Sequence, residues 1–102
     1  MNPDINDLTF KELHINSDEK LCYINNNPIK LTKSEYNVLV FLLTNRNKIF
    51  SREELIKEAW LESVTTRAVD TAISRLRKKL EQYGKHIETR LGFGYGFKET
   101  LD

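Results

Sequence analysis

The sequence predicts an α+β fold in which a small antiparallel sheet comes first, three helices follow, and a β-hairpin ends the domain. Three observations predict this order. Short apolar runs alternate with turn-forming residues near the start, helical spacing follows two helix-capping signals in the middle, and the last stretch, ETRLGFGYGF (88–97), interleaves aromatic residues with glycines. A chain of 102 residues is the right size for one compact domain, so we expect these elements to share a single core.

The sheet is expected over residues 8–31, after a flexible start at residues 1–7. Leu8 to Ile15 interleaves apolar and polar residues, as strands with one buried face do, and LCYI (21–24) and IKL (29–31) are further β-favouring runs. The segments NSDEK and NNNP between them are rich in turn-forming residues. Because tight turns join neighbouring strands, we predict an antiparallel sheet of three or four strands.

The helices are expected over residues 32–83, and the first two begin with a capping box. In this motif the N-cap side chain accepts from the N3 backbone N–H while the N3 side chain accepts from the N-cap N–H; the pairs are Thr32 with Glu35 and Ser51 with Glu54. Apolar residues at helical spacing then mark the buried faces. They are Tyr36, Leu39, Val40 and Leu43 in the first helix, and Leu55, Ile56, Ala59 and Trp60 in the second.

The third helix, from about Thr66 to Tyr83, has two contrasting faces. Its apolar stripe consists of Val69, Ala72, Ile73, Leu76 and Leu80. At about 100° per residue, the opposite face collects Arg67, Thr71, Ser74, Arg75 and Lys78. No glutamate interrupts this outer face, whereas Glu and Lys mix elsewhere in the chain. The outer face is therefore cationic and carries small side chains at its centre.

The charge of the chain is segregated although its net value is only +1. Residues 67–90 contain seven basic and three acidic residues, which favours one positive surface suited to a polyanion. A helix fits the DNA major groove, where arginine pairs with guanine and Ser or Thr bonds to base edges. The simpler alternative is that the basic face only solubilises the domain.

The terminal hairpin is expected over residues 85–98. Its turn should lie near Gly92-Phe93-Gly94, where glycine permits the positive φ that a tight turn requires. Phe97 and Tyr95 should anchor the hairpin to the helices. Phe93 at the tip is harder to explain as a core residue, and contact with a sugar-phosphate wall or with a neighbouring protomer are alternative roles.

Other function classes find little support in the residues. Cys22 is the only cysteine, which excludes an internal disulfide, and neither His14 nor His86 forms a ligand-spaced cluster with it, so we expect no metal and no cofactor. Ser51, His86 and Asp70 could form a triad on paper, but Ser51 is needed as a helix cap, so we expect no catalytic residues and no enzyme. The sequence shows no signal peptide and no membrane-spanning run, and we expect a cytoplasmic protein.

Four blocks in order, LTKSEYNVLVFLL, SREELIKEAW, RAVDTAISRLRKKL and IETRLGFGYGF, resemble the OmpR/PhoB-type winged-helix DNA-binding (effector) domain of bacterial two-component response regulators. The resemblance extends from about Leu8 to Phe97. It implies a winged helix-turn-helix with a four-stranded N-terminal antiparallel sheet, a three-helix bundle and a C-terminal hairpin wing. The implied function is sequence-specific binding of double-stranded DNA in transcriptional regulation within a phosphorelay. No receiver domain is present in these residues, so we expect an isolated effector domain or an abbreviated regulator.

The resemblance also implies which residues contact DNA. Positions that match family phosphate contacts are Trp60, Arg67, Arg77 and Lys78. Positions that face bases or the adjoining backbone are Thr71, Ala72, Ser74 and Arg75. The wing residues are Thr89, Arg90, Leu91, Phe93 and Tyr95. Implied partners are double-stranded DNA, a second protomer on an adjacent half-site, and RNA polymerase through the loop from Leu61 to Thr66; no membrane partner is implied.

The wing departs from the family pattern. The family usually reads Thr-Val-Arg-Gly-x-Gly-Tyr-Arg-Phe, with the arginine before the first glycine entering the minor groove, whereas here Arg90 and Leu91 have exchanged places and Gly96 follows Tyr95. Adjacent strand residues point to opposite faces, so Arg90 cannot simply replace an arginine at position 91. Either the strand end is twisted or the wing reads the minor groove weakly.

The alternative function for the whole domain is a winged-helix module that binds protein without specific DNA binding.

Overall fold

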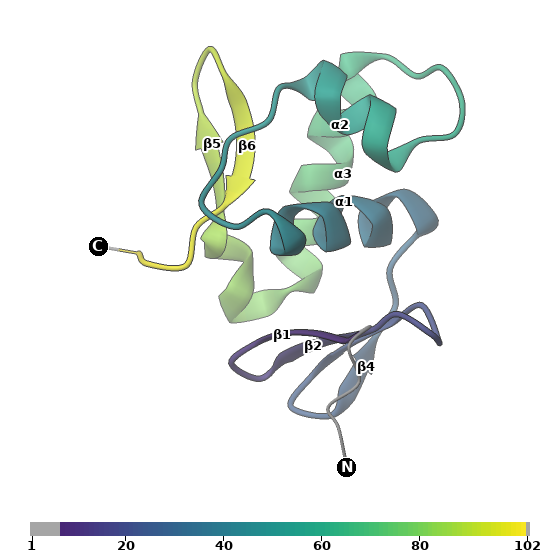
Figure 1. Ribbon diagram of the computed structural model, residues 1–102, viewed down its shortest axis with the longest axis vertical. Helices are drawn as coiled ribbons and strands as arrows, with labels where there is room; N and C mark the ends of the chain where they lie inside the picture. Colours follow the sequence, from purple (N-terminus) through teal and green to yellow (C-terminus); the bar gives the residue numbers. More distant parts are fainter. Residues whose placement is uncertain (1–6, 102) are drawn as a thin grey trace.

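Figure 1 shows the computed structural model, which describes residues 7–101. A four-stranded antiparallel sheet comes first, in the spatial order β1-β2-β3-β4, which confirms the predicted N-terminal sheet. Its strands are β1 (Asp7–Phe10), β2 (Leu13–Asn16), β3 (Leu21–Ile24) and β4 (Asn27–Ile29). The expected flexible start lies outside the described residues except for Asp7. Asp7 belongs to β1 and is paired with Asn16 of β2.

The fourth strand differs from the predicted run over residues 29–31. Asn25 and Asn26 both take left-handed backbone conformations, with φ of 52° and 67°, so two residues suffice for the turn and the strand begins earlier, at Asn27. Pro28 pairs with Tyr23 and belongs to a strand at the edge of the sheet. A proline is tolerated there because its missing N–H can face away from the neighbouring strand.

Three α-helices follow: α1 (Lys33–Thr44), α2 (Arg52–Ala59) and α3 (Thr66–Lys79). Both predicted capping boxes are present. The Glu35 N–H donates to Thr32 Oγ1 at 3.2 Å and the Thr32 N–H donates to Glu35 Oε1 at 3.0 Å. The same pair of bonds joins Ser51 and Glu54 at 3.1 and 2.8 Å. These residues satisfy backbone N–H groups that the helices leave without an internal partner.

The third helix is shorter than predicted. It ends at Lys79 rather than Tyr83, and a 3₁₀ helix, η1 (Glu81–His86), follows. The chain turns at Glu81, whose φ is 55°, and folds back so closely that a Cβ on Gly84 would lie 2.1 Å from the Arg77 carbonyl oxygen. Apolar spacing continues through this segment, and periodicity alone could not reveal the turn.

The hairpin of β5 (Ile87–Arg90) and β6 (Gly94–Phe97) ends the fold and is attached by backbone hydrogen bonds to the segment between α1 and α2. Phe50, in the segment between α1 and α2, forms a β-bridge with Tyr95 through N–H···O bonds of 2.8 and 2.9 Å. A Cβ on Gly94 would lie 1.8 Å from the Phe50 carbonyl oxygen. The close approach of these two segments therefore requires glycine at position 94.

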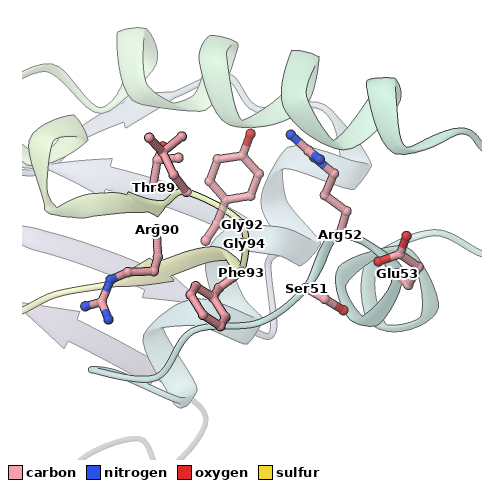
Figure 2. Close-up of a pocket in the computed structure, with 10 residues that line it drawn as sticks. Ser51, Arg52, Glu53, Thr89, Arg90, Gly92, Phe93 and Gly94 are labelled. Atoms are coloured by element: carbon pink, nitrogen blue, oxygen red, sulfur yellow. The ribbon is translucent and has the colours of Figure 1, made fainter.

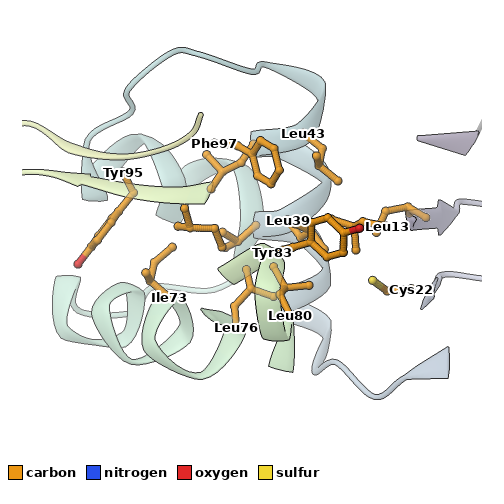
Figure 3. Packing of buried hydrophobic residues seen from close by; sticks show 14 of the residues in the cluster. Leu13, Cys22, Leu39, Leu43, Ile73, Leu76, Leu80, Tyr83, Tyr95 and Phe97 are labelled. Carbon is orange, nitrogen blue, oxygen red and sulfur yellow. The ribbon is translucent and has the colours of Figure 1, made fainter. Parts of the chain in front are cut away.

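The core lies between the sheet, the helices and the hairpin. Figure 3 shows Leu13 and Cys22 of the sheet on one side of the α1 residue Leu39, and Phe97 and α3 side chains on the other. Because α1 is covered by both layers, it buries a wider face than predicted: Val38 and Leu42 are fully buried. Tyr36 and Val40, which we expected in the core, are only half-buried.

Candidate nucleic-acid interface

The outer face of α3 is exposed as the sequence predicts. The five exposed residues are Arg67, Thr71, Ser74, Arg75 and Lys78. None of these side chains makes a hydrogen bond or an ion pair to another residue in the described range 7–101, and no acidic side chain lies among them. The 14-residue helix is about 21 Å long, which exceeds the major-groove width of about 12 Å. The face can therefore contact both bases and flanking phosphates.

The inner face holds the helix against the core. Its buried residues Val69, Ile73 and Leu76 are 0–1% exposed, and Ala72 is 6% exposed. Our expectation that Ala72 faces bases is therefore wrong: its methyl group belongs to the buried stripe. The helical spacing alone already indicated this orientation, and the family position suggested the opposite.

Trp60 and part of the outer face line one depression on the surface. The depression lies where the start of α1 meets the first half of α3, and Trp60, Arg67, Thr71 and Arg75 all border it. Thr32 and Ser34 border the same depression. We did not single out these two hydroxyl residues as site residues, although the capping box at Thr32 places the helix N-terminus here. Backbone and hydroxyl groups of this kind commonly contact phosphate.

Arg77 is engaged within the fold. Its Nη2 donates to the Ile87 carbonyl oxygen at 2.7 Å and to Thr89 Oγ1 at 2.6 Å, and its guanidinium lies 5.8 Å from the centre of the Tyr95 ring. Nε also donates to Ile87 at 3.0 Å. These bonds give Arg77 a structural role, because the side chain fixes the base of the hairpin to α3; its expected phosphate contact stays a prediction. The partners lie on a distant element, which sequence spacing does not reveal.

Asp70 joins α2, α3 and the hairpin. Its Oδ1 accepts a hydrogen bond from Arg52 Nε at 2.7 Å and from the Tyr95 hydroxyl at 2.5 Å. The Tyr95 hydrogen bond is the main cause of a lowered Asp70 pKa, with Arg52 lowering it further against the effect of desolvation. Burial, followed by the bond to Asp70, raises the pKa of Tyr95. The expected anchoring role of Tyr95 is confirmed, whereas its buried ring is not an exposed DNA contact.

An ion pair between half-buried Lys79 and a buried carboxylate fixes the other end of α3. Lys79 Nζ lies 2.6 Å from Glu35 Oε1, and the Glu35 side chain is only 2% exposed. Desolvation opposes ionisation of this carboxyl, but hydrogen bonds from Lys79 and from the Thr32 backbone outweigh it, so the Glu35 pKa is lowered. Glu35 therefore both caps α1 and fixes α3 against it, and it is a positioning residue that sequence reasoning identified only as a cap.

The hairpin turn is the loop Leu91–Gly92–Phe93, closed by the pair Arg90 and Gly94. Gly92 and Gly94 have φ of 85° and 138°, which confirms the need for glycine here. Leu91 is 87% exposed and Phe93 is 70% exposed. The apex of the hairpin and the first turns of α3 lie at the same end of the molecule (Figure 1). The wing tip thus exposes two apolar side chains, and Phe93 lies on the side of the hairpin away from α3 (Figure 2).

Arg90 points away from α3. Figure 2 shows Arg90 and Thr89 on opposite sides of the hairpin, and Thr89 is the side bound to Arg77. Arg90 Nη2 is paired with Glu88 at 3.1 Å. Side chains at the strand end therefore alternate between the two faces as in an ordinary strand. The expectation that a twisted strand end explains the exchange of Arg90 and Leu91 is wrong. The apex itself carries no cation, because Leu91 occupies the position before the first glycine.

Residues considered for other chemistry have structural partners. Ser51 caps α2, Asp70 is bound by Arg52 and Tyr95, and buried His86 bonds through Nδ1 to the Lys98 carbonyl oxygen at 2.7 Å. Within residues 7–101 no group of three or more His, Cys, Asp or Glu side chains is placed to hold a metal ion. In the same range no helix has the length and apolarity needed to cross a membrane.

An N-terminal sheet, three helices with the third exposed along one face, and a hairpin fixed beside that helix define a winged helix-turn-helix domain. The family model described as "Transcriptional regulatory protein, C terminal" matches residues 26–97. The chain therefore belongs to this family, whose members are the OmpR/PhoB-type effector domains of response regulators.

Individual relatives agree with this assignment. The transcriptional regulatory protein SrrA of Staphylococcus aureus is 37% identical over 97 residues, which cover 89% of this chain and 40% of SrrA. The chain thus spans about two fifths of the length of that relative. The fold is similar to the DNA-binding domain of the response regulator AdeR, solved in complex with an intercistronic region (TM-score 0.82, 31% identity, 90% of this chain and 99% of that one). It is also similar to the Klebsiella pneumoniae RstA DNA-binding domain, solved with the RstA box (TM-score 0.81, 28% identity, 92% and 98%).

Proposed function

We propose that this domain binds double-stranded DNA sequence-specifically and regulates transcription as the output domain of a response regulator, with α3 in the major groove and the wing at the minor groove. The observation that carries the proposal is the exposed, acid-free face of α3, whose polar side chains make no hydrogen bond or ion pair within residues 7–101. DNA complexes of the similar AdeR and RstA domains support it.

The outer-face residues divide by length and position. Thr71, Ser74 and Arg75 lie along the middle of the face, where short hydroxyls permit a close approach and arginine can pair with guanine. Arg67 and Lys78 lie near its two ends and are long enough to reach phosphates on the groove walls. We therefore assign base reading to the middle of the helix and phosphate contact to its ends, together with Trp60.

The proposal extends to partners. A single domain of this size covers about 600–1,000 Å² of DNA-facing surface, so we expect a second protomer on an adjacent half-site, about one helical turn away, to raise the affinity. Leu61, which is 88% exposed in the loop between α2 and α3, gives that loop an apolar contact for RNA polymerase. Since bacterial DNA lies in the cytoplasm, we place the protein there.

Selection of bound duplexes from a random DNA pool at moderate salt tests the proposal. The expected result is an enriched motif. Arg75→Ala should then reduce the binding free energy by about 1–3 kcal/mol and relax the sequence preference at one base pair. Lys57→Ala, which removes an exposed cation from α2, is the matched control and should leave the motif unchanged. A pool that yields no motif would contradict specific binding and favour the protein-binding alternative.

A further inference from the structure

The wing apex exposes apolar surface that the fold does not use. Leu91 and Phe93 are 87% and 70% exposed, although large apolar side chains elsewhere in the hairpin, such as Phe97, are buried. Phe93 borders a shallow hollow with Ile49, Glu54 and Arg90, and Leu91 lines the hollow along the wing. Exposed apolar residues gathered at a tip are characteristic of contact surfaces.

The apex lacks the cation that would bind the minor groove electrostatically. Arg90 extends to the side of the hairpin away from α3, where Phe93 also lies, and is paired with Glu88 at 3.1 Å. Leu91 takes the place before the first glycine. Glu53 of α2 borders the hollow along the wing, together with Arg52 and Arg90. The apex residues themselves, Leu91, Gly92 and Phe93, are exposed and uncharged.

The apex is also rigidly mounted. The hairpin is fixed below it by the Phe50–Tyr95 bridge, by the Tyr95 hydroxyl bound to Asp70, and by Arg77 bound to Ile87 and Thr89. These contacts join the wing to α3, so the apex is held at a fixed position relative to the cationic face (Figure 1). A side chain that separates stacked bases must not yield, and this mounting meets that requirement.

We propose, on the basis of the proposed function, that Leu91 and Phe93 act as an apolar wedge that enters the minor groove and bends the DNA, with Leu91 leading. Apolar side chains inserted at a base step partly unstack it and kink the duplex toward the major groove. Such a bend would bring the duplex around the wing and the first half of α3. The preferred steps are the flexible pyrimidine–purine steps TA and CA/TG, since these are easily unstacked.

The experiment uses a duplex with a single half-site taken from the selected motif and labelled with a fluorophore at each end. Energy transfer reports the bend, and anisotropy on the same duplex reports affinity. The wild-type domain should bend the duplex, and Leu91→Ser combined with Phe93→Ser should abolish the bend and weaken binding about tenfold. Leu21→Ala, an exposed leucine on the N-terminal sheet at the other end of the molecule, is the matched control and should change neither reading.

The variant Leu91→Arg distinguishes insertion of an apolar side chain from a simple loss of contact surface. Arginine at this position can bind a narrow minor groove electrostatically, so this variant should retain affinity and lose the bend. Wild-type protein that binds without bending, or a double-serine variant that bends equally, would overturn the wedge and leave the proposed function intact. A further outcome is that the double-serine variant bends the single half-site normally and fails only to recruit a second copy to tandem half-sites. That outcome would overturn the wedge and assign the apex to contact between protomers. Absence of DNA binding by the wild type would instead remove the proposed function itself.

Discussion

The Tyr95 hydroxyl donates a 2.5 Å hydrogen bond to Asp70, and through this bond the wing is attached to α3. Asp70 also accepts from Arg52 at 2.7 Å, so a single carboxylate joins α2, α3 and β6. The groups that would contact the major and minor grooves are therefore held in a fixed relative position.

Removal of this one hydroxyl should be measurable in stability. Tyr95→Phe keeps the buried ring and leaves Asp70 with Arg52 and water, because the Asp70 side chain is 41% exposed. We expect a loss of about 1 kcal/mol in the free energy of unfolding, measured by urea denaturation. Tyr23→Phe, which removes an exposed hydroxyl bond to Glu19, is the control and should cost less. Equal effects of the two variants would argue against a special role for Asp70.

The Glu35–Lys79 pair should make stability depend on pH in a defined direction. Because the folded-state pKa of Glu35 lies below its ordinary value of 4.5, the stabilisation is complete above about 4.5 and is lost as pH falls through the lowered folded value. Glu35→Gln keeps a residue able to complete the capping box and removes the charge. We expect this substitution to lower the free energy of unfolding by about 1–3 kcal/mol at pH 7.

The measurement for this pair is urea denaturation of both proteins between pH 7 and pH 3. The difference between wild type and Glu35→Gln should shrink toward the acid end. Glu54→Gln alters the corresponding exposed box and is the matched control, with a small effect expected. A gap between wild type and Glu35→Gln that stays constant down to pH 3 would show that the charge of Glu35 contributes nothing.

Two wing glycines should respond differently to alanine. Both have positive φ, but a Cβ at position 94 would lie 1.8 Å from the Phe50 carbonyl oxygen, whereas a Cβ at position 92 meets nothing within 4 Å. Gly92→Ala should therefore cost only the strain of the left-handed conformation, about 1–2 kcal/mol. Gly94→Ala should cost clearly more and detach the hairpin, as seen in thermal unfolding. Similar melting temperatures for the two variants would contradict the described packing.

Adjacent cations on α3 should have separable roles. Lys78 is exposed and makes no ion pair in the described residues, so Lys78→Gln should reduce the slope of log K against log salt by about 0.9 without loss of stability. Arg77→Gln should instead lower the unfolding free energy, since it breaks the bonds to Ile87 and Thr89. Affinity titrations over a range of salt and urea denaturation of both variants provide the check. A loss of stability in Lys78→Gln and a changed salt slope alone in Arg77→Gln would reverse the roles assigned to the two residues.

Local signals in the sequence were sufficient for much of the fold and less so for the site. The capping boxes at Thr32 and Ser51 depend only on residues three apart, and the buried stripe of α3 depends only on helical period, so both could be predicted. Arg77 and Glu35 could not be placed correctly, because their partners lie on elements 10 to 44 positions away. The end of α3 was missed because the fold-back at Gly84 leaves the apolar spacing unchanged.

The separation of the two faces of α3 has an evolutionary consequence. Arg67, Thr71, Ser74, Arg75 and Lys78 have no bonding partners within residues 7–101, whereas Asp70, Arg77 and Lys79 on the same helix secure the architecture. Mutations at the first group can accumulate without penalty to folding. A duplicated gene could thus acquire a different operator preference through a few surface exchanges while its scaffold stays constant.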